Sequence, residues 1–195
     1  MQYLVQLGAI DMEIVLNNFV KDALALNATH ASLVEVGKIP FSEDFRKLCE
    51  ENSCGSYNKN WMCPPTVGPI SDLIKRALEF DRGLIFQTVQ QLEDSFDWEG
   101  MQEGQANHEK IFRKILEHLE KNNVFREILP LSAGPCMYCQ KCAHLTGKEC
   151  YFPNKAVSSV EAYGINVTAL VKGCGIPYHN GQNTVSYVGL ILFKM

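Results

Sequence analysis

The chain has 195 residues, of which 46% are hydrophobic and 21% charged, and a formal net charge of −4. This length is enough for one domain with a sizeable core, and an acidic chain without a basic stripe is not expected to bind nucleic acid nonspecifically. Because residues 1–5 lack the basic start of a signal peptide and no apolar run reaches the length of a membrane span, we expect a cytoplasmic protein with no membrane contact.

The first part of the chain predicts a helix, a strand and a second, short helix. Residues 11–26 have the apolar spacing of an amphipathic helix, and Asn27 is suited to a left-handed stop. Residues 32–36 are rich in β-branched side chains and predict a strand. Ser42 is then expected to cap a short helix that ends at Leu48.

The middle of the chain begins with an irregular stretch, residues 49–68, which is rich in Cys, Asn, Gly and Pro. A helix is expected to start at Pro69, since proline suits a first helical turn, and to end at Gly83. Residues 84–89 predict a short apolar strand, and the acidic residues 91–104 predict a surface loop.

The last part of the chain adds two helices and two strands. Residues 105–121 predict a helix and residues 126–131 a strand. Ser158 and Glu161 have the spacing of a capping box, which predicts a helix that begins there and ends near Gly173. Residues 184–193 predict the last strand.

Strands therefore alternate with helices along the whole chain, and no repeat or linker divides it. This pattern favours an α/β or α+β fold with a mixed central sheet flanked by helices. We expect residues 1–195 to form a single metal-binding domain with cysteine blocks at residues 49–65 and 136–153.

The chain contains eight cysteines. In a reducing cytoplasm, cysteines serve more often as metal ligands or reactive thiols than as disulfides. The alternative, a secreted disulfide framework, is disfavoured because the sequence shows no export signal.

The strongest motif is the downstream block, in which three cysteines are separated by two residues each and a fourth follows after seven more: Cys136, Cys139, Cys142 and Cys150. Bacterial ferredoxins bind a cubane iron–sulfur cluster with a similar run, but their last gap is three residues. Cys150 therefore either completes this centre or serves a different one. A four-cysteine structural zinc site is the alternative, although zinc sites usually pair two Cys-x2-4-Cys units across a longer loop.

The upstream block is looser and contains three cysteines followed by two prolines: Cys49, Cys54 and Cys63. Three thiols leave one coordination position open, for Cys174, Cys150, a histidine or a substrate. An open position is typical of catalytic metal sites. Eight cysteines also match two four-thiol cubanes by count. The alternative is that the upstream thiols are redox-active or simply buried, since cysteine is often a small buried hydrophobic residue. We expect the two blocks to meet in the fold.

The two blocks together resemble a known family. The resemblance rests on Cys49, Cys54, Tyr57, Lys59, Trp61 and Cys63-Pro64-Pro65, on residues 131–136 continuing through Cys139, Cys142, Cys150 and Pro153, and on residues 159–167. These features are similar to the predicted metal-binding protein family called domain of unknown function 2284. The resemblance implies a bound metal, with iron–sulfur chemistry expected, and it does not imply an activity.

Our leading hypothesis is a cytoplasmic iron–sulfur protein in which the four downstream cysteines bind one [4Fe–4S] cluster. It would transfer electrons to or from a redox partner protein, or assist a partner metalloenzyme. The upstream cysteines would form a second site or contribute to a composite one. Two alternatives remain open: an enzyme that uses an open iron or zinc position at Cys49, Cys54 and Cys63 as a Lewis acid, and a structural zinc-binding interaction module.

Overall fold

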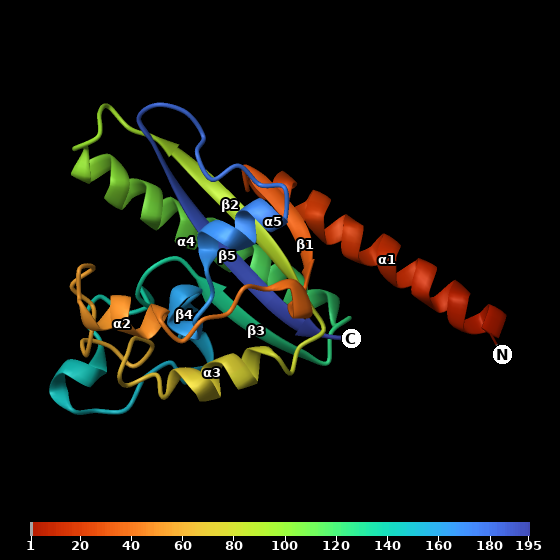
Figure 1. Ribbon diagram of the computed structural model, residues 1–195, viewed down its shortest axis with the longest axis horizontal. Helices are drawn as coiled ribbons and strands as arrows, with labels where there is room; N and C mark the ends of the chain where they lie inside the picture. Colours follow the sequence, from red (N-terminus) through yellow and green to blue (C-terminus); the bar gives the residue numbers. More distant parts are fainter. Residues whose placement is uncertain (1) are drawn as a thin grey trace.

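The computed structural model describes the backbone of residues 2–195 and the side chains of residues 12–195. Within this part of the chain, five strands form one sheet in the order β1-β2-β5-β3-β4 (Figure 1). The strands are β1 (His30–Glu35), β2 (Arg82–Gln91), β3 (Glu127–Ser132), β4 (Ser158–Ser159) and β5 (Thr184–Lys194). All neighbours are antiparallel except β3 and β4, which are parallel. The sheet is therefore mixed, as the sequence predicts.

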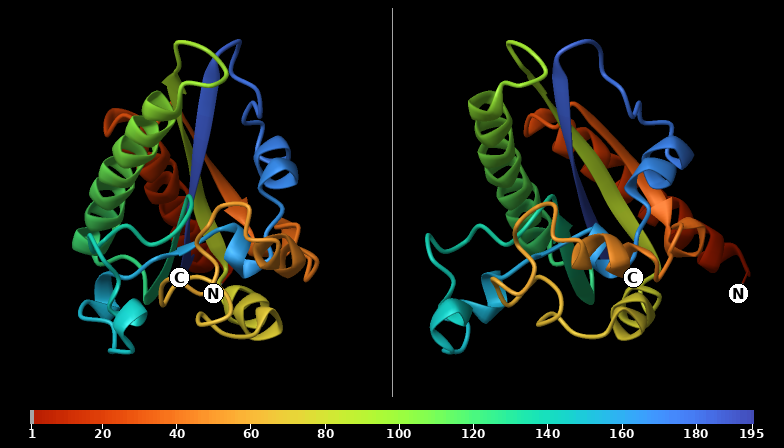
Figure 2. Two further views of the ribbon diagram at one scale, coloured as in Figure 1. Left: turned by 90° about the vertical axis from the view of Figure 1, so that its left-hand side faces the viewer. Right: turned by 60° about the vertical axis from the view of Figure 1, so that its left-hand side comes forward.

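Helices cover both faces of this sheet (Figure 2). They are α1 (Gln2–Ala25), α2 (Phe45–Glu50), α3 (Ile70–Ala77), α4 (Trp98–Asn122) and α5 (Val167–Gly173). The helices α1 and α4 pack on one face, while α3 and α5 pack on the other. The expected α+β domain with a mixed sheet between helices is confirmed. Among residues 2–195, no helix combines the length and apolarity needed to cross a membrane.

The alternation of side chains along β5 explains why both faces are covered. Leu190 and Leu192 belong to the core beneath α3 and α5, whereas Ile191 and Phe193 belong to the core beneath α1 and α4. Successive side chains of a strand point to opposite faces of the sheet. A run of apolar residues therefore requires a helical layer on each side.

The first predicted elements are confirmed with shifted ends. Helix α1 includes residues 11–26 except the last and extends back to Gln2, and Asn27 follows it with a left-handed φ of 77°. The strand expected at residues 32–36 is β1, which runs from His30 to Glu35. Helix α2 begins only at Phe45, because the Ser42 hydroxyl accepts a hydrogen bond from the backbone N–H of Asp44 at 3.2 Å and forms a turn before the helix.

The prediction that Gly83 ends a helix is wrong. Helix α3 ends at Ala77, and Gly83 lies inside β2, opposite Leu192 of β5. A Cβ at this position would lie 2.7 Å from Cδ2 of Leu192. The glycine thus serves the close approach of two strands, and a sequence pattern cannot distinguish that role from a helix stop.

The surface loop in the structure is shorter than the one predicted at residues 91–104, because α4 already begins at Trp98. The carboxylate of Asp97 caps this helix by accepting a hydrogen bond from the backbone N–H of Gly100 at 2.8 Å. Acidic residues are favoured at a helix start, where they interact with unpaired N–H groups. Some of the acidic residues that suggested a loop therefore belong to the start of a helix.

The prediction that a helix begins at Ser158 is also wrong. Ser158 and its neighbour pair with β3 as the short strand β4. A 3-10 turn follows, and Gly164, with a left-handed φ of 72°, ends it. Helix α5 starts at Val167, and Asn166 caps it by accepting a hydrogen bond from the N–H of Ala169 at 3.0 Å. The local serine spacing is overridden by sheet pairing.

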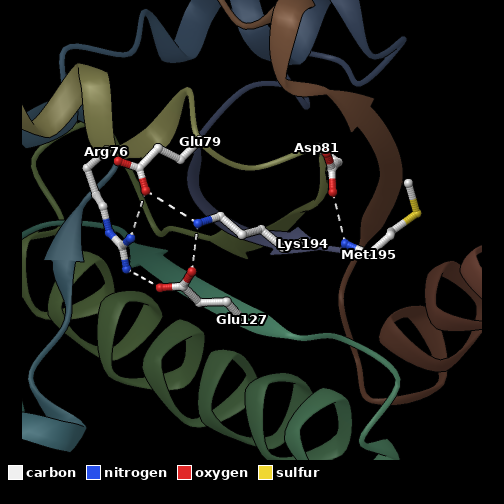
Figure 3. Close-up of polar contacts among 6 residues, drawn as sticks. All are labelled: Arg76, Glu79, Asp81, Glu127, Lys194 and Met195. Atoms are coloured by element: carbon white, nitrogen blue, oxygen red, sulfur yellow. Dashed lines mark hydrogen bonds and ion pairs between the residues drawn. The ribbon is translucent and has the colours of Figure 1, made fainter.

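An ion-pair network joins α3, β3 and β5 at the edge of the domain (Figure 3). Arg76 and Lys194 each pair with both Glu79 and Glu127; the Lys194–Glu127 distance is 2.8 Å and the Arg76–Glu79 distance 3.1 Å. Asp81 accepts a hydrogen bond at 2.9 Å from the backbone N–H of the residue after β5. Because these side chains are partly exposed, the network stabilises the fold modestly.

Gly189 of β5 lies where a side chain cannot fit, which gives a test of the core. A Cβ there would lie 2.6 Å from Cζ of Phe86 and 3.0 Å from Cδ2 of Phe112, and both rings are fully buried. We expect Gly189→Ala to lower the free energy of unfolding by about 1–3 kcal/mol, the usual cost of overpacking. Gly173→Ala is the control, since no atom lies within 4 Å of its added Cβ. Urea unfolding would measure both; equal midpoints would contradict the packing described.

Candidate metal centre

The two cysteine blocks lie side by side, although some seventy residues separate them in the sequence (Figures 1 and 2). The indole Nε1 of Trp61 donates a hydrogen bond to the carbonyl oxygen of Lys148 at 3.0 Å. His144 Nε2 lies 3.2 Å from the carbonyl oxygen of Asn58, and the His144 and Trp61 rings meet edge to face at 5.0 Å. The expectation that the blocks meet is confirmed, and His144 acts as a hydrogen-bonding residue between them.

The downstream block is the connection between β3 and β4, two neighbouring parallel strands. It leaves the sheet through Gly134, whose φ of 73° is left-handed, and a Cβ there would lie 2.5 Å from Nε2 of Gln105. A 3-10 turn, Ala143–Thr146, then ends at Gly147, which is also left-handed. These glycines let the segment turn sharply and bring its cysteines back toward one another.

All four downstream thiols border one small pocket. Its lining contains Cys136, Cys139, Cys142 and Cys150 together with Trp61, Met62, Tyr138, Phe152 and Ala156. The Tyr138 and Phe152 rings lie 5.0 Å apart, and the Arg113 guanidinium lies 5.3 Å from the centre of the Tyr138 ring. The thiols therefore share an apolar and aromatic surrounding, to which the upstream block contributes Trp61 and Met62.

The charges of the downstream thiolates would act on one another. Partial desolvation raises the pKa of the Cys139 thiol, and the charges that Cys136, Cys150 and Cys142 would carry raise it further. A bound cation has the opposite effect, since metals bind the thiolate form. The group is thus arranged so that a metal would relieve the repulsion among its ligands.

The upstream cysteines also gather. Cys63 is buried, and burial raises the pKa of its thiol; a hydrogen bond with Asn60 lowers it, and the charges of Cys54, Cys49 and Cys136 raise it again. Burial likewise raises the pKa of Cys49 on α2, while the nearby Arg46 guanidinium lowers it. Cys136 is therefore close to both groups of thiols and lies where the two blocks meet.

The predicted ligands nevertheless do not converge on a point. Within the described part of the chain, no three His, Cys, Asp or Glu side chains come as close together as a single bound ion requires. All eight cysteines carry free thiols. The seven predicted ligands thus lie near one another without meeting at one point, and their role in metal binding stays a prediction.

Cys174 lies apart from both blocks. It caps α5 and borders a different cavity, which Glu13 and Arg82 also line. Burial alone raises the pKa of its thiol, so no other cysteine lies close enough to affect it. The fold therefore does not bring Cys174 to the open coordination position of the upstream block.

The spacing of Ser158 and Glu161 predicts only a helix-capping role for Glu161, whereas this residue lines a larger cavity beside the cysteine blocks. Burial raises the pKa of this carboxyl, and hydrogen bonds with its own backbone N–H and with Ser159 oppose that effect. The available signal was an isolated acid in an otherwise apolar segment, residues 160–165.

Comparison with known proteins agrees with the resemblance described above. No curated protein and no solved structure matches the chain. The model of the family DUF2284, described as predicted metal-binding protein, matches residues 32–193, a range that includes both cysteine blocks, strands β2 to β4 and all of β5 except its last residue. The chain belongs to the DUF2284 family of predicted metal-binding proteins.

Proposed function

We propose that the four downstream cysteines hold a [4Fe–4S] cluster and that the protein transfers single electrons in the cytoplasm. The observation that carries this proposal is the shared apolar pocket of Cys136, Cys139, Cys142 and Cys150. Eight free thiols also fit a reducing compartment.

The arrangement of the thiols supports a cluster over a single zinc ion. Zinc requires four sulfurs at about 2.3 Å from one point. A cubane instead binds each thiolate to a different iron, so its ligands surround a larger object. The compact Cys-x2-Cys-x2-Cys run, whose thiols border one pocket together with Cys150, supports the second case.

When bound, such a cluster supplies one-electron redox chemistry at a potential that its surroundings tune. Trp61, Tyr138 and Phe152 would exclude water from the sulfurs. Trp61 is held in place by its hydrogen bond to the Lys148 carbonyl oxygen. By limiting the access of solvent, these side chains would tune the potential of the cluster.

The surface around the pocket supports a protein partner. Large apolar side chains are exposed there: Met137, Tyr138, Tyr151 and Phe152. Residues 136–155 contain three lysines and one glutamate, which give a charge of +2 in a chain of net charge −4. An acidic redox protein or metalloenzyme would complement this surface, since opposite charges steer association.

Metal analysis tests this proposal. Protein purified under strict anaerobiosis should be brown and should contain about four irons for each bound cluster. Colourless protein with stoichiometric zinc would contradict the proposal and would favour the structural zinc-binding module.

A specific observation favours a second candidate, an enzyme with an open metal position at the upstream block. An open cavity of about 410 Å³ lies beside that block: Phe45 lines it, and Cys49 lies one turn further along α2. Residues four apart share a helix face. A metal held by Cys49, Cys54 and Cys63 would supply a Lewis acid next to this cavity.

Cys63→Ser tests whether the upstream block binds metal. We expect this variant to lose part of the bound iron while it keeps the redox signal of the downstream cluster, because Cys63 is not among the residues lining the four-thiol pocket. An unchanged iron content would show that the upstream block is not an iron site.

A further inference from the structure

The cavity of about 410 Å³ has the size of a small-molecule site. It lies between one face of the sheet, the loop after β3 and the start of α5. Gln87 of β2, Ser186 of β5, Gly134 after β3 and residues 166–168 at the start of α5 are among the residues that line it.

The lining of this cavity carries one charged group. Glu161 is its only Asp, Glu, Lys, Arg or His, and the other polar groups are amides and hydroxyls. None of the ion pairs found among the described residues includes Glu161. A ligand with a carboxylate or phosphate would meet a like charge here and no cation.

Two aromatic residues line much of the remaining wall: Phe45 and Tyr178. Aromatic faces attract organic cations through their quadrupole, and the attraction increases where water is excluded. A carboxylate beside such rings is the arrangement that recognises an ammonium group.

We propose that this cavity binds a small organic cation, a compound with a quaternary ammonium group, with the Glu161 carboxylate as its counter-ion. Burial raises the pKa of Glu161 and so disfavours the charge of its carboxylate. A cationic ligand restores that charge because it supplies the missing partner. The proposal stands apart from the metal assignment, since every group it uses lies in the cavity.

The cavity lies next to the two cysteine blocks. The charge of Glu161 is close enough to raise the pKa of Cys49, and Gly134 lies two residues before Cys136. An ammonium compound bound at Glu161 would therefore lie beside both cysteine blocks.

A pair of isosteric probes tests the proposal on the anaerobically purified protein. Choline and the uncharged 3,3-dimethylbutan-1-ol have the same shape, so calorimetric titration with each isolates the effect of charge. We expect choline to bind at least ten-fold more tightly, and we expect Glu161→Gln to abolish this preference. Equal affinities, no binding of choline, or a preference that persists in Glu161→Gln would overturn the proposal.

Two further variants keep the test independent of folding and of metal. Glu149→Gln is the matched control, because Glu149 is exposed and outside the cavity, and its choline affinity should equal that of the wild type. Tyr178 is 45% exposed, so Tyr178→Ala should fold and should weaken choline binding about two- to five-fold. An unchanged affinity in Tyr178→Ala would contradict the aromatic wall.

Discussion

Replacing Cys139 with serine should remove the iron–sulfur signal of the protein. Cys139 borders the four-thiol pocket and is coupled electrostatically to the three other downstream cysteines. A serine hydroxyl is a poor ligand for iron in a cubane, which is held by thiolates. We expect about four irons to be lost, as measured by iron analysis and by electron resonance of the reduced protein.

Cys174→Ser is the matched control for this experiment. Cys174 is also half-buried, but it borders a separate cavity and is coupled to no other thiol. Its iron content and resonance signal should equal those of the wild type. If both variants lose the signal, or if Cys139→Ser keeps it, the downstream cysteines have been misassigned.

The protein should lose stability as the pH falls from about 7 to 4, and His108 should cause much of this loss. The side chain is 1% exposed, and burial lowers its pKa from 6.5 to about 4. Its Nδ1 lies 2.9 Å from the Thr88 hydroxyl, while its Nε2 has no hydrogen-bond partner among the described residues. Rings of Phe86, Phe112 and Tyr187 surround it.

The direction of the effect follows from which state binds the proton. Between pH 6.5 and 4, the unfolded chain protonates this histidine and the folded chain does not, so unfolding becomes easier as the pH falls. The contribution of His108 to stability is fully present above pH 6.5. Linkage gives a loss of about 2 kcal/mol by pH 5 and about 3 kcal/mol once the pH is below 4.

Urea unfolding at several pH values measures this loss. His108→Gln keeps a polar group near Thr88 but cannot take up a proton, so its stability should depend less on pH than that of the wild type. His179→Gln is the control, since His179 is exposed. Parallel pH profiles for the wild type and His108→Gln would show that the buried histidine is not the cause.

Local signals in the sequence were sufficient for much of the fold. Asn27 ends α1 in the left-handed conformation, which asparagine tolerates better than most residues. The spacing of Cys136, Cys139 and Cys142 indicated a shared site because residues so close in sequence cannot lie far apart. These predictions depend on a few neighbouring residues, and the fold does not override them.

Long-range pairing explains what the sequence could not predict. The position of Gly83 is set by Leu192, and Ser158 pairs with Leu131 of β3. Neither partner is visible in a local pattern, so both residues were given helix roles. The same limit applies to Glu161, since its importance comes from a cavity that Gln87 and Tyr187 also line, from strands far away in sequence.

The anchoring of the downstream block in the sheet has a thermodynamic consequence. Residues 133–157 leave β3 and return through β4, and these strands are hydrogen-bonded neighbours. Adjacent strands lie about 4.8 Å apart, so the two ends of the loop are already held together before any metal binds. The entropy of closing this loop is lost when the sheet forms, and it does not oppose ligation. More of the binding free energy then remains as affinity, and release of metal should loosen the loop while the sheet stays intact.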